Sequence, residues 1–270
     1  MTWTPLFIAI LCTGVALPAF SKQHTPSTEE PLDLAAPSQC FFIPPQGWEI
    51  ADQSILSPRV KIAFIKNTGK GFCPSLNLAI ESTQVSLVDY LKSVKAIHEQ
   101  NRSNHWRQLG KVRTPAGLAQ LTEMDSTTEW GPIRILQLIL VKEGHAYVLT
   151  AAALKEEFSN FYKEIQASFR SLTLTTDLLA AIPQLERKET LKQHQQQLIA
   201  AAREASSKAT EPINLLDNPL FQEEHWLPFQ RTILNNFSDM GAFWQVLFLR
   251  EIQEKLIASQ QLDIPPIDKN

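Results

Sequence analysis

Histidine and glutamate near residue 98 are the first side chains whose types and spacing could do chemistry. His98 and Glu99 resemble the start of a zinc-protease helix, in which two histidines four positions apart share the metal. Position 102 is arginine and His105 is seven residues from His98, so the two imidazoles do not meet on one helix face. We therefore predict an exposed helix end here and no metal site.

A glycine-rich segment, 67–71, resembles a fragment of a phosphate-binding loop. It reads Asn-Thr-Gly-Lys-Gly, without the first glycine at the required distance and without serine or threonine after Lys70. A hairpin turn is the better interpretation. The sequence also has no Gly-x-Ser-x-Gly segment and no cysteine beside a candidate histidine, although residues distant in sequence can still assemble a serine triad.

Two acidic pairs, Glu156-Glu157 and Glu223-Glu224, could suggest acid/base chemistry. Adjacent residues on a helix diverge by about 100°, so we interpret both pairs as solvated charge. The sequence thus predicts no catalytic residue, no metal ligand and no cofactor. The net charge of −3 gives no reason to expect nucleic acid as a partner.

Two cysteines, Cys40 and Cys73, lie outside the first 21 residues. In an exported protein an even pair is typical of a disulfide, which would stabilise the fold by roughly 3–4 kcal/mol in the chain-entropy model. The alternative is a metal-binding pair. No other histidine or cysteine lies at ligand spacing from either residue, which favours the disulfide.

The first 21 residues predict export. Met1 to Ser21 contain no charged side chain, and an apolar core from Leu6 to Leu17 is followed by Pro18. Small residues at Ala19 and Ser21 suit a signal peptidase. A membrane anchor is the alternative, but it needs about 20 apolar residues. We expect cleavage, no membrane span afterwards, and a periplasmic or secreted location.

A linker and an α/β domain follow. Residues 22–39 are proline-rich and polar, as in a linker. The domain over 40–175 opens with a strand and turn at Cys40 to Ile50, and alternating apolar residues at 60–65 and 76–80 predict a hairpin. Ser86, with Asp89 three positions on, predicts the start of a helix.

Four more strand-like runs and a helix complete this domain. The runs cover 106–112, 118–124, 133–141 and 146–152, and the helix covers about 155–170 with aromatic residues on one face. Strands in such short succession should be hairpin neighbours. The fold class is therefore α+β, a mainly antiparallel sheet with helices packed on it.

Residues 40–174 resemble the PsbP-like fold, an α-β-α sandwich shared by the photosystem II subunit PsbP and DcrB-type bacterial envelope proteins. The resemblance is carried by Phe42-Ile43-Pro44 with Gly47-Trp48, the hairpin and first helix, the run from Gly144 to Thr150, and the closing Ser168-Phe169. It implies an accessory or assembly role and offers no catalytic residues to carry over.

Residues 176–270 change character. A segment from 184 to 208 rich in Ala, Gln, Glu and Lys predicts a mostly exposed helix, and a second helix from about 228 to 260 is interrupted near Gly241. We predict a helical hairpin attached to the α/β domain.

An apolar block, 241–249, is the most unusual feature of this C-terminal region. It is too short to span a bilayer. Three interpretations compete: a helix buried all round, a docking surface for a protein partner, and an in-plane membrane helix. The residues predicted to bind a partner are Phe237, Phe243, Trp244, Leu247 and Phe248.

The function predicted from these features is an exported, non-catalytic binding or assembly protein of the bacterial envelope, with a possible protein partner at the C-terminal helices. The alternative is an envelope hydrolase with a site built from scattered residues. A cleft with convergent histidine and carboxylate side chains would favour the hydrolase, and an exposed apolar groove beside the C-terminal helices would favour the binding protein.

Overall fold

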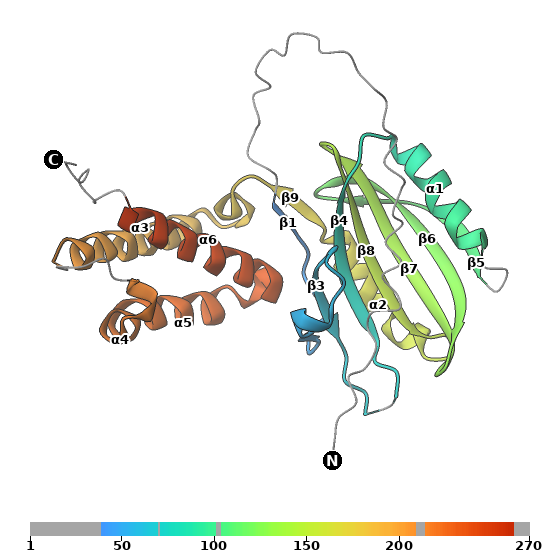
Figure 1. Ribbon diagram of the computed structural model, residues 1–270, viewed down its shortest axis with the longest axis horizontal. Helices are drawn as coiled ribbons and strands as arrows, with labels where there is room; N and C mark the ends of the chain where they lie inside the picture. Colours follow the sequence, from blue (N-terminus) through green and yellow to red (C-terminus); the bar gives the residue numbers. More distant parts are fainter. Residues whose placement is uncertain (1–38, 70, 101–103, 209–213, 262–270) are drawn as a thin grey trace, which may run out of the picture. The chain divides into compact units, whose positions relative to one another are not determined.

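A computed structural model describes residues 39–69, 71–100, 104–208 and 214–261 of the chain (Figure 1). The predicted signal peptide and all but the last residue of the predicted linker lie outside these residues. The described chain forms two compact units. We call Pro44–Thr173 the sheet unit, and residues 39–43 together with those from Leu174 onward the helical unit.

The sheet unit is built on seven strands in the order β2-β3-β4-β8-β7-β6-β5, and every neighbouring pair is antiparallel. The predicted α+β class with a mainly antiparallel sheet is confirmed. The strands are β2 (Glu49–Ile50), β3 (Val60–Ile65), β4 (Ser75–Ser82), β5 (His105–Thr114), β6 (Gly117–Thr128), β7 (Gly131–Lys142) and β8 (His145–Leu154).

Tight turns fix the register of the sheet. The predicted hairpin is present: β3 pairs with β4, and the amide of Gly69 donates to the Asn67 side chain in the turn between them. The four later runs form the meander β5-β6-β7-β8, with Glu143 and Gly144 at positive φ in the last turn. Glycine suits that conformation because it has no Cβ.

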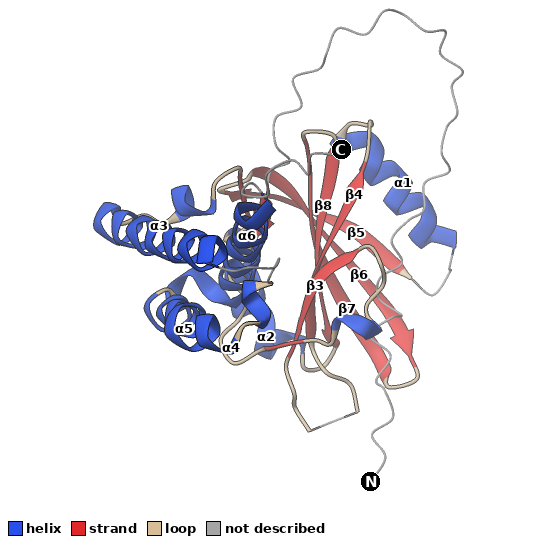
Figure 2. Ribbon diagram, turned by 60° about the vertical axis from the view of Figure 1, so that its left-hand side comes forward, coloured by secondary structure: helices blue, strands red, loops and turns tan. Residues whose placement is uncertain are grey.

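Two helices cover the sheet on opposite faces (Figures 1 and 2). Helix α1 (Leu87–Gln100) begins at Ser86, whose hydroxyl accepts from the Asp89 amide and donates to the Asp89 carboxylate, as predicted. Its residues Tyr90, Leu91 and Val94 pack on Ile139 and Val148.

Helix α2 (Phe158–Arg170) contacts β8. Alternate residues of the central strands, such as Leu138 and Leu149, are fully buried on the face away from α1. The sheet is therefore apolar on both faces, and each face needs a helix to cover it.

The helical unit contains three long helices, α3 (Leu185–Lys208), α5 (Leu227–Asn236) and α6 (Gly241–Gln261). Shorter segments are η3 (Leu178–Ala181), η4 (Leu215–Asp217), α4 (Pro219–Phe221), η5 (Gln222–Trp226) and η6 (Ser238–Met240). The predicted C-terminal helical region is thus present. The interruption at Gly241, whose φ is +82°, divides the expected second helix, so the hairpin gains a third helix.

The N-terminal strand joins the helical unit. Strand β1 (Gln39–Phe41), which we expected to open the α/β domain, pairs with β9 (Thr173–Thr175). The Gln39 amide donates to Glu251 of α6 at 3.2 Å, and the Phe42 ring meets Phe243 edge-on at 5.5 Å between centroids. Within the described residues, no helix is both long enough and apolar enough to cross a bilayer.

Candidate functional site

The apolar block predicted to bind a partner lies in the core of the helical unit. Trp244 is fully buried, and its indole N–H donates to the carbonyl of Leu178 at 3.1 Å. Phe237, Phe243 and Phe248 are also buried, whereas Leu247 is half-buried.

Five aromatic rings form a continuous row through this core. In order they are Trp226, Phe229, Phe248, Trp244 and Phe237, and successive ring centroids lie 6.2, 6.5, 5.0 and 5.7 Å apart. The row ends at Arg187, whose guanidinium lies 4.8 Å from the Phe237 ring. Rings at these separations stabilise one another beyond the effect of burial alone.

The structure therefore shows that four of the five residues predicted to bind a partner are buried within the protein. A partner would reach these four rings only if the helical unit opened, so their role in binding stays a prediction. The row nevertheless leads outward, because Phe229 forms part of the floor of an open pocket.

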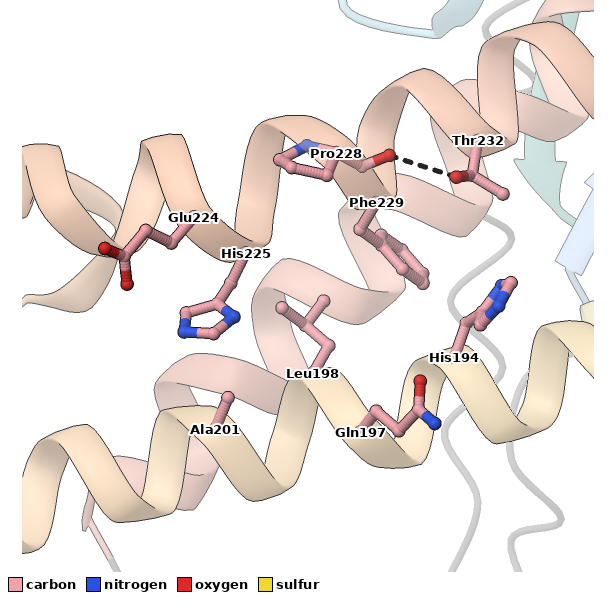
Figure 3. A pocket seen from close by; sticks show the side chains of 9 residues that line it. All are labelled: His194, Gln197, Leu198, Ala201, Glu224, His225, Pro228, Phe229 and Thr232. Atoms are coloured by element: carbon pink, nitrogen blue, oxygen red, sulfur yellow. Dashed lines mark hydrogen bonds between the residues drawn. The ribbon is translucent and has the colours of Figure 1, made fainter.

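The pocket lies between α3 and the segment η5–α5 and has a volume of about 340 Å³ (Figure 3). Its floor is apolar and consists of Leu198 and Ala201 from α3, and Pro228 and Phe229 from α5. Leu198 and Phe229 are buried. The volume is at the lower end of the range typical of ligand pockets.

Polar side chains surround the apolar floor. His194 and Gln197 come from α3, Glu224 and His225 from η5, and Thr232 from α5. Figure 3 shows the His194 and His225 rings approaching the pocket from opposite helices. The His225 ring also packs against Phe221, with centroids 5.3 Å apart, which holds the imidazole beside its own helix.

A π-helical segment, η5, places Glu224 and His225 at the pocket. Pro228 follows three residues after His225 and has no N–H, and its ring would clash with the carbonyl of Glu224 in a regular α-helix. A wider turn before Pro228 relieves that clash. Segments of this kind often lie at functional sites.

Three of the rim side chains make no polar contact within the described chain. Within the described chain, neither imidazole nor the Glu224 carboxylate has a hydrogen bond or ion pair. The Thr232 hydroxyl donates to the Pro228 carbonyl at 3.0 Å. A nucleophile is normally activated by a base that a third group orients. Across the same residues, no cluster of three His, Cys, Asp or Glu could hold a metal ion.

Sequence reasoning missed this pocket. It interpreted Glu223-Glu224 as solvated charge and assigned no role to His194 or His225. The only local signal in the sequence was Pro228, shortly after His225. A proline indicates that the helix is irregular at this point, but it does not show that α3 packs against the same helix.

The expected disulfide is absent, because Cys40 and Cys73 are both free thiols in the structure. Cys40 is buried in β1 of the helical unit, and burial strongly raises the pKa of its thiol. Cys73 is half-buried in the β3–β4 turn of the sheet unit. The sequence shows an even pair of cysteines, but it does not show that Cys40 lies in the helical unit and Cys73 in the sheet unit.

The histidines considered for zinc lie on two different elements. His98 lies on α1 and His105 on β5. The predicted exposed helix end is wrong for His98, which is only 5% exposed, and burial lowers the pKa of its imidazole.

Comparisons with known proteins give structural neighbours only. No protein-family model matches the chain, and no curated protein matches it. LpqN, described as involved in cell envelope biogenesis of Mycobacterium tuberculosis, is 11% identical over 53% of this chain and 87% of its own, with a TM-score of 0.40.

Two other solved structures are similar at the same level. PsbP from the cyanobacterium Synechocystis is 13% identical over 55% of this chain and 98% of its own, with a TM-score of 0.37. A protein from Bacteroides thetaiotaomicron is 9% identical over 83% of this chain and 79% of its own, with a TM-score of 0.33. PsbP, whose family the sequence resembles, is thus among the structural neighbours, but similarities this weak carry no inference about family or activity.

Proposed function

We propose that this chain is an exported, non-catalytic binding protein, and that its helical unit takes an apolar group of a protein partner into the pocket between α3 and η5–α5. Export rests on the sequence of Met1 to Ser21. The role in envelope biogenesis described for LpqN belongs to that protein and adds no support here.

The pocket itself carries this proposal. An apolar floor with buried Leu198 and Phe229 is open to solvent and surrounded by hydrogen-bonding side chains. Such a site gains free energy by removing an apolar group from water, and the rim then selects for polar atoms beside that group. The aromatic row behind Phe229 makes the floor rigid, which reduces the entropic cost of binding.

Site-specific photo-crosslinking in the native cells tests the proposal. A photo-reactive residue at Gln197, on the rim, should form a discrete adduct with a protein. The same residue at the neighbouring Gln196, which is exposed but does not line the pocket, should not. Ala201→Trp should fill the pocket and abolish the adduct without lowering the melting temperature. Equal adducts from positions 197 and 196, or an adduct that persists in Ala201→Trp, would contradict pocket binding.

The hydrolase remains a second candidate because two imidazoles and a carboxylate line one pocket. It requires turnover that depends on these groups. If the full chain hydrolyses chromogenic ester or amide substrates and His194→Ala or His225→Ala abolishes that activity, the non-catalytic proposal is wrong. Absence of activity agrees with the binding proposal, whereas activity that survives both substitutions would place catalysis outside the pocket and would also contradict a non-catalytic function.

A further inference from the structure

One edge of the seven-stranded sheet is long and exposed. Strand β5 ends the strand order and pairs only with β6, so one side of its backbone has no partner strand among the described residues. At the opposite edge β2 has two residues, whereas β5 has ten. An exposed strand edge presents free N–H and C=O groups that can pair with another extended chain.

The charge on this edge is one-sided. β5 contains Arg107, Lys111 and Arg113 and no acidic residue. Arg107 is neutralised by Glu123, whose carboxylate lies 2.6 Å away. Lys111 and Arg113 are exposed and have no acidic partner in the described chain.

A bulge restricts where pairing can occur. The β5–β6 register shifts between Gln108 and Gly110, and Gly110 has a φ of +140°. The regular stretch after the bulge runs from Lys111 to Thr114. Residues two apart on a strand point to the same face, so Lys111 and Arg113 project side by side.

We infer that the β5 edge binds an extended acidic peptide segment of a protein partner, which adds as an antiparallel or parallel strand beside Lys111–Thr114. Main-chain hydrogen bonds would provide affinity. Acidic side chains at alternate positions of the peptide would meet Lys111 and Arg113 and provide specificity. A second copy of β5 is excluded as the occupant, because its cations would face these cations. This site is independent of the pocket in the helical unit.

Binding of synthetic peptides to the full chain tests the inference. The probe is a peptide with glutamate at every second position and threonine or valine between. The comparison peptide has the same composition with its glutamates in one block. The alternating peptide should bind more tightly, and hydrogen exchange should show new protection confined to β5.

Charge reversal supplies the matched variants. Lys111→Glu with Arg113→Glu should weaken binding of the alternating peptide by about tenfold or more, because two favourable cross-strand pairs become repulsive. Lys192→Glu with Arg203→Glu, at exposed positions on α3, makes the same change in net charge and should leave binding unchanged. Lys111→Gln with Arg113→Gln should give an intermediate loss, and circular dichroism checks that each variant is folded.

Several results would overturn the inference. They are no binding of the alternating peptide, equal binding of the block peptide, protection outside β5, or equal losses in both reversed variants. Equally tight binding to vesicles of anionic lipid, lost in the same β5 variant, would mean that the cations serve a membrane surface and would also refute it.

Discussion

At the scale of single residues, Asp125 of β6 organises charged groups of β7 and of the segment that follows β8. Its carboxylate accepts two hydrogen bonds from Arg134, at 2.8 and 3.0 Å, and lies 2.8 Å from Lys155. The Arg134 guanidinium in particular lowers the pKa of this carboxyl to about 2. A folded-state pKa below the unfolded value of about 3.9 means that the contribution to stability is present above pH 4 and is lost as the pH falls toward 2.

We predict that Asp125→Asn lowers the free energy of unfolding at pH 7 by about 1–2 kcal/mol, between the values for a surface ion pair and for a hydrogen bond to a charged group. The difference in free energy of unfolding between Asp125→Asn and the wild type should be smaller at pH 3 than at pH 7. Urea denaturation at the two pH values measures it, with Glu99→Gln on the exposed part of α1 as the control. A difference that does not change with pH would contradict this role of the carboxylate.

His98 should make the sheet unit sensitive to mild acid. Burial lowers the pKa of its imidazole, so the unfolded chain binds the proton more readily than the folded chain. Stability should therefore fall as the pH drops below about 6.5, the pKa of an unperturbed histidine. His98→Leu should reduce that loss between pH 7 and pH 5 in thermal melts, whereas His105→Gln, at an exposed position, should not.

Trp244 should be among the residues on which the helical unit depends most. Trp244→Ala removes a fully buried indole, its hydrogen bond to Leu178, and its stacking on Phe237 and Phe248. Loss of a buried aromatic side chain costs about 3–5 kcal/mol. The melting temperature of the helical unit should fall clearly, and Leu247→Ala should cost less because Leu247 is only half-buried. An unchanged melting temperature for Trp244→Ala would contradict the packing described above.

At the scale of elements, Gly241 makes α5 and α6 two helices. Its φ of +82° and ψ of +153° lie in a region that is essentially restricted to glycine. Gly241→Ala should therefore lower the free energy of unfolding by about 1–3 kcal/mol. Gly69→Ala is a suitable comparison, because φ is +70° there and a Cβ would meet nothing within 4 Å, so it shows the cost of a positive φ alone. Chemical denaturation should show the larger loss at Gly241.

Elements with a strong local pattern could be predicted from the sequence. The hairpin β3–β4, the capped start of α1 and the strands β5 to β8 all follow from alternation, turn residues and a capping pair. The pairing of β1 with β9 could not be predicted, because it joins segments far apart in the chain. The pocket was missed for the same reason, since His194 and His225 come together only when α3 packs near η5.

At the scale of the whole molecule, the chain has two cores. Leu138 is fully buried in the sheet unit, and Trp244 is fully buried in the helical unit. Units with separate cores often unfold in separate steps. Leu138→Ala should speed hydrogen exchange mainly in β6 to β8, and Trp244→Ala mainly in α3, α5 and α6. Exchange that rises equally in both units in either variant would show one cooperative unit instead.

The π-helical turn at η5 has a consequence for how this protein can change over generations. A turn of this kind is an α-helix that holds one extra residue, so a deletion of Glu223 would restore the regular helix. Side chains before the deletion, including the buried Phe221, would then rotate by about 100° relative to α5. The regular helix would also bring back the clash of the Pro228 ring with the carbonyl four residues before it. The extra residue of η5 and Pro228 therefore depend on each other, and the loss of one is tolerated only together with the loss of the other.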